Sequence, residues 1–552
     1  MTVYWVVWDA GAHWVVDRLE REGALPAVTR MRTSGTLAAA RPPRPNCQTP
    51  PSLATLFTGA PPARHGVTGF TVPYGGPGSA DHVSGFDARF PAVPTVWERL
   101  GERGLRGAFV HVPWVFGADD LPGGYADAAV EAYSRRIVRH AVYEVPAGPG
   151  TRVWDIGGYA VEVTRQEPDA VRLDSGRARV RQSAGEEWRP LDLGGGHGTW
   201  VGCVRVDGRL LLVHTGVWRT RIGGSDPATV ERLTRCPPFA GEGVGPLYRQ
   251  GVFGPRLADG GDGTAEEVFL TSVECVARGF TAAADAVLDT HDADLVIVYL
   301  PMTDDVGHEL LGWCDPRSGA HRPDVEQAVW AHVRRCYQWS DTVLGRVLDR
   351  AGPEDTVVLG ADHGMVGSTH LVHLNDALVR CGLARRTADG ALDPERSQVF
   401  YHPANNGALW PGGAHAGDPP RARRAMERAV AALRGLTDDA TGLPVVAAFL
   451  EPDGPVPDMD TATAPVHVAL VDDYQPTAAL AGDGGPVVRP TPKTGAHVVN
   501  TGDSRLHAVH AAVGPGIAPG VRGGVVDNTE PAALVLRHLG LDHSPTTPLH
   551  TP

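Results

Sequence analysis

Lysine is almost absent from this sequence. Lys493 is the only one, so every other cationic side chain among the 50 Lys and Arg residues is an arginine. A P-loop requires a lysine after its glycines, which excludes that class of nucleotide-binding protein and leaves Lys493 as the one candidate for Schiff-base chemistry. The pentapeptide G-x-S-x-G is missing as well, so the sequence gives no support to a serine hydrolase with a nucleophile elbow.

Cysteine is scarce and scattered: there are 7, and no C-x-x-C pair. This pattern excludes a disulfide framework and a structural zinc knuckle, and favours reduced thiols in a cytoplasm. The N-terminal segment "MTVYWVVWDAG" lacks a basic region and a cleavage site, and it predicts a first strand instead of a signal peptide. No apolar run is long enough to span a bilayer. We therefore expect a cytoplasmic protein without a membrane partner.

The formal net charge of -14 excludes a surface built to bind a nucleic-acid polymer or an anionic membrane. It is compatible with a small phosphorylated substrate, because bound metal ions can reverse the local field. The chain has 552 residues with 42% hydrophobic and 21% charged side chains. This is the composition of a globular protein with a sizeable core, and the length is too great for one compact domain.

Three apolar segments end directly in polar side chains. "VYWVVWD" ends at Asp9, "ADLVIVYLPMTDD" ends at Asp304 and Asp305, and "DTVVLGADH" ends at Asp362 and His363. Continuous apolar runs are typical of strands buried on both faces, as in a parallel sheet covered by helices. Helical spacing follows at 93–104, 266–289 and 325–351. The sequence therefore predicts an α/β fold with a mostly parallel central sheet between helices, and polar side chains at the strand ends where ligands bind.

Two regions interrupt this alternation. Residues 119–265 are rich in Gly and Pro with short alternating strands, which predicts an inserted β-rich subdomain. Residues 400–490 contain one helical segment and several short strands, which predicts a smaller cap. The catalytic core is then expected in three parts, 1–118, 266–399 and 491–552, the last with a strand in "HAVHAAVGPGI" and a closing helix in "NTEPAALVLRHLGL".

The acidic side chains and histidines at the strand ends are candidate metal ligands. Asp304 and His308 have the i, i+4 spacing that places both on one face of a helix, which Asp305 lacks. Aspartate oxygens and histidine nitrogens are ligands of Zn²⁺ and related ions. Six candidates are enough for two ions once a nucleophile and water are added: Asp9, Asp304, His308, Asp362, His363 and His497.

The sequence resembles the type I phosphodiesterase/nucleotide pyrophosphatase branch of the alkaline phosphatase superfamily. The matching motifs are "WDAG" at Asp9, "QTPPSLATLFTGAPPARHGVTGF" at Thr49, "DDVGHE" at Asp304, "ADHGM" at Asp362 and "GAH" at His497. The resemblance covers nearly the whole chain and is loose in the 119–265 insertion. It implies an alkaline-phosphatase-like fold and a hydrolase of phosphodiester or nucleotide pyrophosphate-type bonds.

The resemblance also implies a role for each motif residue. One metal ion would be held by Asp9, Thr49, Asp362 and His363, and the other by Asp304, His308 and His497. Thr49 would be the nucleophile and would form a phosphothreonine intermediate. We expect two Zn²⁺ ions, with Mn²⁺ as the alternative. The prolines at 50 and 51 would stiffen the entry, and backbone N–H groups at the start of the following helix would face the phosphoryl oxygens.

Two further residues are expected at the substrate. Ser52 occupies the position where the resemblance implies an asparagine that holds the phosphoryl group, and its alternative role is to cap a helix. Lys493 lies four residues before His497 and is either a phosphate contact or an exposed loop residue.

Other functions remain open on the same residues. A phosphomonoesterase or a phosphonate hydrolase would use the same metals and threonine. A sulfatase would need Cys47 in a C-x-P-x-R context, whereas this sequence has Cys-Gln-Thr-Pro-Pro. A mutase and a catalytically inactive binding protein are the remaining alternatives.

Overall fold

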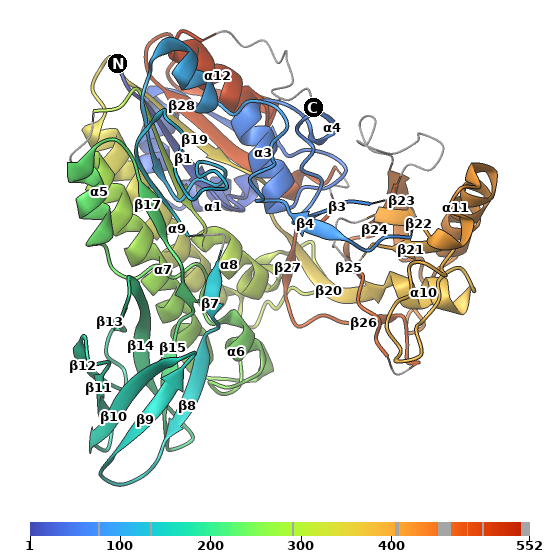
Figure 1. Ribbon diagram of the computed structural model, residues 1–552, viewed down its shortest axis with the longest axis horizontal. Coiled ribbons are helices and arrows are strands. Elements are labelled where there is room, and N and C mark those ends of the chain that lie inside the picture. The colour runs from blue at the N-terminus through green and yellow to red at the C-terminus, as the bar shows by residue number, and fades with distance from the viewer. Residues whose placement is uncertain are drawn as a thin grey trace.

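The computed structural model describes residues 1–75, 78–132, 135–289, 292–402, 408–450, 465–482, 484–499 and 502–541. Its centre is a nine-stranded sheet with helices on both faces (Figure 1). The strand order is β17 (Arg221–Gly223), β6 (Ala126–Glu131), β5 (Gly107–Val110), β18 (Leu295–Leu300), β1 (Val3–Trp8), β19 (Thr356–Ala361), β28 (Ala508–Val513), β2 (Thr36–Arg41) and β29 (Val521–Asp527). Pairs that include β17 or β28 are antiparallel and the others are parallel. The predicted α/β class with a mostly parallel sheet is confirmed.

The helices of the described residues complete the core and its attachments. They are α1 (His13–Arg21), α2 (Pro26–Ser34), α3 (Thr49–Thr58), α4 (Pro62–His65), α5 (Pro227–Thr234), α6 (Gly245–Arg249), α7 (Thr264–Leu288), α8 (Met302–Leu310), α9 (Glu326–Arg350), α10 (Leu374–Arg380), α11 (Pro419–Arg434) and α12 (Glu530–His538). The helices expected at 266–289 and 325–351 are α7 and α9, and the closing helix is α12. No described helix has the length and apolar character needed to cross a membrane.

The central strand β1 shows why its sequence is apolar throughout. All six of its residues are buried. Trp5 packs edge-on against Phe57 of α3, whereas Trp8 packs edge-on against Tyr337 of α9. Because side chains alternate along a strand, Trp5 and Trp8 point to opposite faces of the sheet. The sheet is therefore covered by α3 on one face and α9 on the other, and polar residues can be accommodated only where the strand ends.

The prediction of a helix at 93–104 is wrong. Only a short 3₁₀ helix, Glu98–Arg103, forms there, and it ends at Gly104 with φ +68°. The Glu98 carboxylate accepts hydrogen bonds from the backbone N–H and the hydroxyl of Thr95, which closes a turn before the helix starts. Proline before this turn and glycine within the segment both oppose an α-helix, and they outweighed the apolar spacing.

Two antiparallel sheets form a β-rich lobe between residues 141 and 214 (Figure 1). One sheet has the order β12 (Arg179–Ser183), β11 (Ala170–Asp174), β10 (Tyr159–Glu167), β9 (Gly150–Ile156), and the other β13 (Arg189–Gly194), β14 (His197–Val206), β15 (Arg209–His214), β8 (Ala141–Val145). The predicted insertion began at 119 and ended at 265, but β6 and β17 within that range pair into the central sheet. The domain limits themselves stay a prediction.

A smaller lobe follows β19. It contains a four-stranded sheet of β21 (Val399–Tyr401), β22 (Ala408–Pro411), β24 (Val466–Leu470) and β23 (Val446–Leu450). Helices α10 and α11 share a separate hydrophobic core with this sheet. A second small sheet joins β20 (Val366–His373) to β25 (Asp473–Thr477), β26 (Val488–Pro490) and β27 (Gly495–Ala496). The chain returns through β27 to the central sheet, which brings His497 back to the strand ends.

Candidate active site with two ligand clusters

Thr49 is the first residue of α3, immediately before two prolines. Proline fits the first turn of a helix, where its missing N–H has no helical acceptor. Thr49 is buried, with 5% of its surface exposed. Its hydroxyl oxygen lies 3.5 Å from Asp9 Oδ1 and 3.3 Å from His363 Nε2. The hydroxyl is therefore held among expected metal ligands that come from two other parts of the chain.

Of the backbone N–H groups expected to face a phosphoryl oxygen at the start of α3, only that of Thr49 remains available among the first four residues. Pro50 and Pro51 have no N–H group, and the N–H of Ser52 donates to the carbonyl of Gln48 at 3.1 Å. The loop before the helix is instead fixed by side chains. The Gln48 side-chain oxygen accepts from Asn46 Nδ2 at 3.2 Å and from the N–H of Phe70 at 3.1 Å.

The first cluster consists of Asp9, Asp362 and His363, all buried, with ligand atoms close enough together to hold one ion. Strands β1 and β19 are parallel neighbours, so their ends bring Asp9 and Asp362 together. His363 Nε2 lies 3.5 Å from Asp9 Oδ1 and 3.2 Å from Asp362 Oδ2. His363 Nδ1 lies 2.9 Å from the carbonyl oxygen of Gly364. A carbonyl can only accept, so Nδ1 carries the proton and Nε2 keeps its lone pair for a metal ion.

The turn after β1 is strained, and Asp362 holds it in place. Ala10 has φ +50°, a left-handed conformation that costs a non-glycine residue about 1–2 kcal/mol. Its N–H donates to Asp362 Oδ1 at 2.9 Å, and its carbonyl accepts from the Tyr337 hydroxyl at 3.2 Å. This strain lies one residue from Asp9, and it fixes the direction in which that carboxylate leaves the strand.

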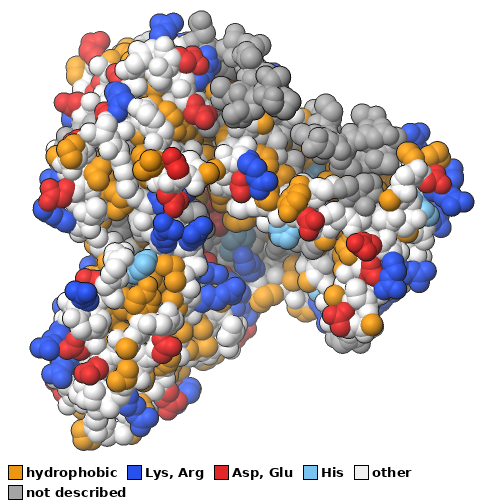
Figure 2. Space-filling view, viewed as in Figure 1, with side chains coloured by type: hydrophobic (Ala, Val, Ile, Leu, Met, Phe, Trp, Pro, Cys, Tyr) orange, Lys and Arg blue, Asp and Glu red, His pale blue; other side chains and the backbone are white. Residues whose placement is uncertain are grey.

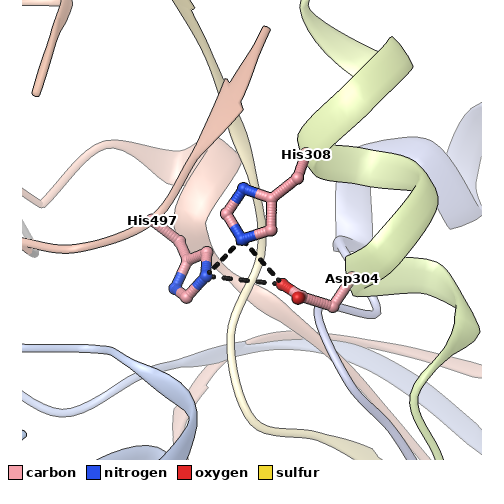
Figure 3. A group of neighbouring side chains, drawn as sticks. All are labelled: Asp304, His308 and His497. Atoms are coloured by element: carbon pink, nitrogen blue, oxygen red, sulfur yellow. Dashed lines mark hydrogen bonds and ion pairs between the residues drawn. The ribbon is translucent and has the colours of Figure 1, made fainter. Parts of the chain in front are cut away.

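The second cluster consists of Asp304, His308 and His497 (Figure 3). Asp304 and His308 lie on one face of α8, as their spacing predicts. His497 Nε2 lies 3.3 Å from Asp304 Oδ1 and 3.2 Å from His308 Nε2. His308 Nδ1 donates to the carbonyl of Gly495 at 2.9 Å, which leaves its Nε2 free for a metal. The two clusters adjoin, because the rings of His363 and His497 stack with centroids 3.8 Å apart.

Burial and mutual repulsion shape the charges of this site. Burial raises the pKa of Asp9 well above its usual range, and the neighbouring carboxylates of Asp362 and Asp304 raise it further. Burial likewise raises the pKa of Asp362 to about 7. It lowers the pKa of His308 to about 3 and also lowers the pKa values of His363 and His497. The imidazoles are therefore neutral, and the crowded carboxylates of Asp9 and Asp362 need positive charge from another source.

The donor set fits two divalent ions. Two buried ligand atoms have no hydrogen-bond partner among the described residues: Asp304 Oδ1 and Asp362 Oδ2. Leaving a buried carboxylate oxygen unpaired is costly, and coordination of a cation removes that cost. Neutral histidine nitrogens with carboxylate oxygens, and no cysteine, are ligands that suit Zn²⁺.

Three residues that the sequence did not single out support the first cluster by hydrogen bonds: Tyr299, Thr303 and Asn528. The Tyr299 hydroxyl donates to Asp9 Oδ2, and the Thr303 hydroxyl donates to the Asp9 carbonyl. Asn528 donates through Nδ2 to the carbonyls of Ala361 and Asp362, at 3.1 and 2.8 Å. Tyr299 stands out in the sequence as a polar aromatic side chain near the end of an apolar strand. Asn528 belongs to a motif assigned only to the closing helix.

Ser52 and Cys47 are both buried beside Thr49. Ser52 does not cap α3, because that helix begins after Gln48 without a side-chain cap, and Ser52 Oγ has no partner among the described residues. The Cys47 thiol donates to the carbonyl of His497 at 2.8 Å, and burial raises its pKa. Cys47 is thus a protonated thiol that supports the second cluster, a poor match for the reactive position a sulfatase would need.

Asp305 and Lys493 lie close to the second cluster without belonging to it. Asp305 points away from His308: its Oδ2 accepts from the N–H of Gly243 at 2.6 Å. Lys493 is half-buried on the loop before β27. The next residue, Thr494, donates from its N–H to the carbonyl of His308 at 2.9 Å. The choice of Asp304 over Asp305 thus agrees with the geometry, and Lys493 lies beside the cluster instead of on a remote loop.

Comparisons with known proteins concern the family and the fold. The family model for type I phosphodiesterase/nucleotide pyrophosphatase matches residues 11–435. A structure of murine ectonucleotide pyrophosphatase/phosphodiesterase 5 has a TM-score of 0.50 at 12% identity, covering 99% of this chain and 97% of that one. Phosphonoacetate hydrolase from Sinorhizobium meliloti 1021, in complex with phosphonoacetate, has a TM-score of 0.50 at 13% identity, covering 98% and 96%. At these identities the likeness concerns the fold. A search of curated proteins returned no match.

Proposed function

The chain belongs to the type I phosphodiesterase/nucleotide pyrophosphatase family and is a hydrolase of phosphoryl bonds, and from this we propose that it is a two-metal phosphodiesterase with Thr49 as its nucleophile. The substrate would be a small phosphodiester or a nucleotide pyrophosphate. The observation that carries the proposal is the place of the Thr49 hydroxyl, 3.5 Å from Asp9 and 3.3 Å from His363, with a second ligand cluster adjoining.

The first cluster would hold one ion together with Thr49, and Asp304, His308 and His497 would hold the second. Bound there, divalent ions lower the pKa of a hydroxyl and offset the negative charge of a phosphoryl transition state. Thr49 would attack phosphorus opposite the leaving oxygen, so the bond to the leaving group breaks as the threonine ester forms. Water would then cleave the phosphothreonine ester and restore the hydroxyl.

The remaining residues orient these groups. Asp362 fixes the strained turn at Ala10 and so directs Asp9, while the Tyr299 hydroxyl occupies the second oxygen of Asp9. Ser52 is the side chain best placed to reach a phosphoryl oxygen, since its buried Oγ lies one helical turn from Thr49 without a partner among the described residues. A buried, unpaired hydroxyl gains most from a ligand that accepts its hydrogen bond.

We further propose a cytoplasmic enzyme that uses two Zn²⁺ ions. All seven cysteines are free thiols, which fits a reducing compartment. A phosphonate hydrolase is the second candidate, because the same ligands and nucleophile would serve carbon–phosphorus cleavage and the phosphonoacetate hydrolase fold is similar.

The test combines metal content with hydrolysis rates. Wild type and Thr49→Ala are compared on bis-p-nitrophenyl phosphate, p-nitrophenyl phosphate, a p-nitrophenyl nucleotide ester and phosphonoacetate. Thr58→Ala is the matched control, because it makes the same change at another buried position of α3. Two ions per chain, with diester cleavage lost only in Thr49→Ala, would support the proposal. A preference for phosphonoacetate would favour the second candidate, and unchanged rates in Thr49→Ala would overturn the mechanism.

A further inference from the structure

Lys493, the only lysine of the sequence, lies on a loop that is fixed against the second cluster. Its loop packs directly on α8 and on the turn after it. The N–H of Thr494 donates to the His308 carbonyl at 2.9 Å, and Thr494 Oγ1 accepts from the N–H of Gly312 at 3.3 Å. A Cβ at Gly312 would meet Thr494 O at 2.0 Å, so the two backbones are in close contact. Lys493 is therefore anchored through its neighbour, with little freedom to move away from His308.

The ammonium group of Lys493 lacks a carboxylate partner among the residues that the structure describes. It makes no ion pair with any residue in the described ranges, although it is half-buried. Its charge acts electrostatically on His308 and Glu309 of α8. A half-buried cation without a counter-ion is unfavourable unless a ligand supplies one. The arginines of this neighbourhood, by contrast, are paired.

A second cation acts on Glu309 together with Lys493. Arg249, at the end of α6, forms an ion pair with Glu309, the residue that follows His308 on α8. Glu309 is 3% exposed, and its Oε2 has no partner among the described residues. One carboxylate, that of Glu309, therefore stands against two cations, Arg249 and Lys493. Figure 2 shows Lys and Arg side chains around and inside the hollow in the middle of this face, with histidine side chains beside them.

We propose that Lys493, supported by Arg249, forms an anion-binding subsite that receives a negatively charged group on the leaving side of the substrate. The inference rests on the proposed function. Thr49 lies against the first cluster, and an in-line displacement expels the leaving group on the side away from the nucleophile. That side is occupied by the second cluster, and Lys493 lies on the loop that contacts α8 and also carries His497. The preferred substrates are then phosphoanhydrides whose leaving group is itself a phosphate.

The test uses two substrates with the same transferred nucleotide. Thymidine triphosphate releases pyrophosphate, whereas the p-nitrophenyl ester of thymidine monophosphate releases a leaving group without a second anion. In Lys493→Met we expect kcat/KM to fall about tenfold to a hundredfold for the triphosphate, the range of one lost charged hydrogen bond. For the nitrophenyl ester we expect kcat/KM to change less than about twofold. Lys493→Arg, which keeps the positive charge, should retain most of the wild-type kcat/KM for the triphosphate. Arg103→Met, which removes the same charge from an exposed position, is the control.

Equal losses on both substrates would contradict the subsite, since Lys493 would then act through His308. Equal rates for wild type and Lys493→Met on the triphosphate would contradict it too. Phosphonoacetate is a further arm, because a loss confined to it would identify a carboxylate as the bound anion and would overturn the preference for a phosphate.

A binding measurement separates this inference from the proposed function. Inorganic pyrophosphate is titrated into metal-stripped protein by calorimetry, and we expect the Kd to rise at least about tenfold in Lys493→Met. The same Kd in both proteins, or no binding to wild type, would overturn the subsite. If wild type hydrolyses neither nucleotide, the proposed function fails, while this titration still decides whether the anion subsite exists.

Discussion

The two ligand clusters are built in different ways. The first is assembled by the sheet itself: Asp9 and Asp362 end neighbouring parallel strands, and the side chains of Asp362 and His363 are fully buried. The second joins a helix to a distant loop, and the side chains of Asp304 and His308 keep 22% and 18% exposure. The first cluster thus inherits the rigidity of the core, whereas the second depends on how the 493–497 loop packs against α8.

This difference predicts unequal effects when one histidine of each cluster is removed. His363→Ala should lower kcat for the diester by about 10⁴-fold, because it removes a ligand shared with the nucleophile. His497→Ala should lower it by about 10²-fold, since only leaving-group stabilisation is impaired. Steady-state rates and metal content of both variants check this. Equal losses would show that the clusters do not divide the work between nucleophile and leaving group.

A substitution outside both clusters should damage only the second. In Gly312→Ala the new Cβ would meet Thr494 O at 2.0 Å, so the loop that carries His497 must shift. We expect one of the two ions to bind about tenfold to a hundredfold more weakly, the range for groups that orient metal ligands. Gly101→Ala is the control, because a Cβ there meets nothing within 4 Å. If metal titration shows weaker binding of both ions, or of neither, the two clusters are not supported by separate parts of the structure.

The pH dependence of stability should change when metal is removed. Burial raises the pKa of Asp362 to about 7, so the folded metal-free protein binds a proton more tightly than the unfolded chain. That stabilisation is complete below the unfolded pKa near 4 and is lost as pH rises through about 7. As pH rises from about 5 to about 7.5, the Tm of metal-stripped wild type should therefore fall relative to that of metal-stripped Asp362→Asn. The other titrating groups, among them the buried histidines, are common to both proteins and cancel in this difference.

Two variants separate the groups that contribute to the pH dependence of Tm. Asp305 and Glu309 also have pKa values raised to about 7 by burial and contribute to it. Asp362→Asn should change it only in metal-stripped protein, whereas Asp305→Asn should change it with or without metal. A difference in Tm between stripped wild type and stripped Asp362→Asn that stays constant with pH would show that the carboxylates of the first cluster are not crowded as described.

The smallest effect is expected at Cys47. Cys47→Ala removes one hydrogen bond to the His497 carbonyl and a small buried volume, which costs about 1 kcal/mol of unfolding free energy. Diester hydrolysis should fall less than about tenfold, through the second cluster alone. Complete loss of activity with metal retained would instead favour chemistry at the thiol.

Much of this site follows from local sequence patterns. Apolar strands that end in Asp9, Asp304 and Asp362 predicted the sheet edge, and the spacing of Asp304 and His308 predicted a shared helix face. His497 was a candidate ligand from the sequence, but its grouping with Asp304 and His308 came only from the resemblance to a family, because no local pattern joins it to α8. The hydrogen bonds from Tyr299, Thr303 and Asn528 depend on tertiary packing that no spacing reveals. The helix expected at 93–104 was wrong because Thr95 and Glu98 close a turn that competes with it.

The central claim is that Thr49 carries the transferred phosphoryl group. It is tested most directly by rapid acid quench during turnover of the p-nitrophenyl ester of thymidine monophosphate, followed by mass spectrometry of the peptides. We expect a thymidine monophosphoryl adduct on Thr49 of wild type and of Thr58→Ala, and no adduct in Thr49→Ala. An adduct on Cys47 or Ser52, or full turnover by Thr49→Ala, would contradict it.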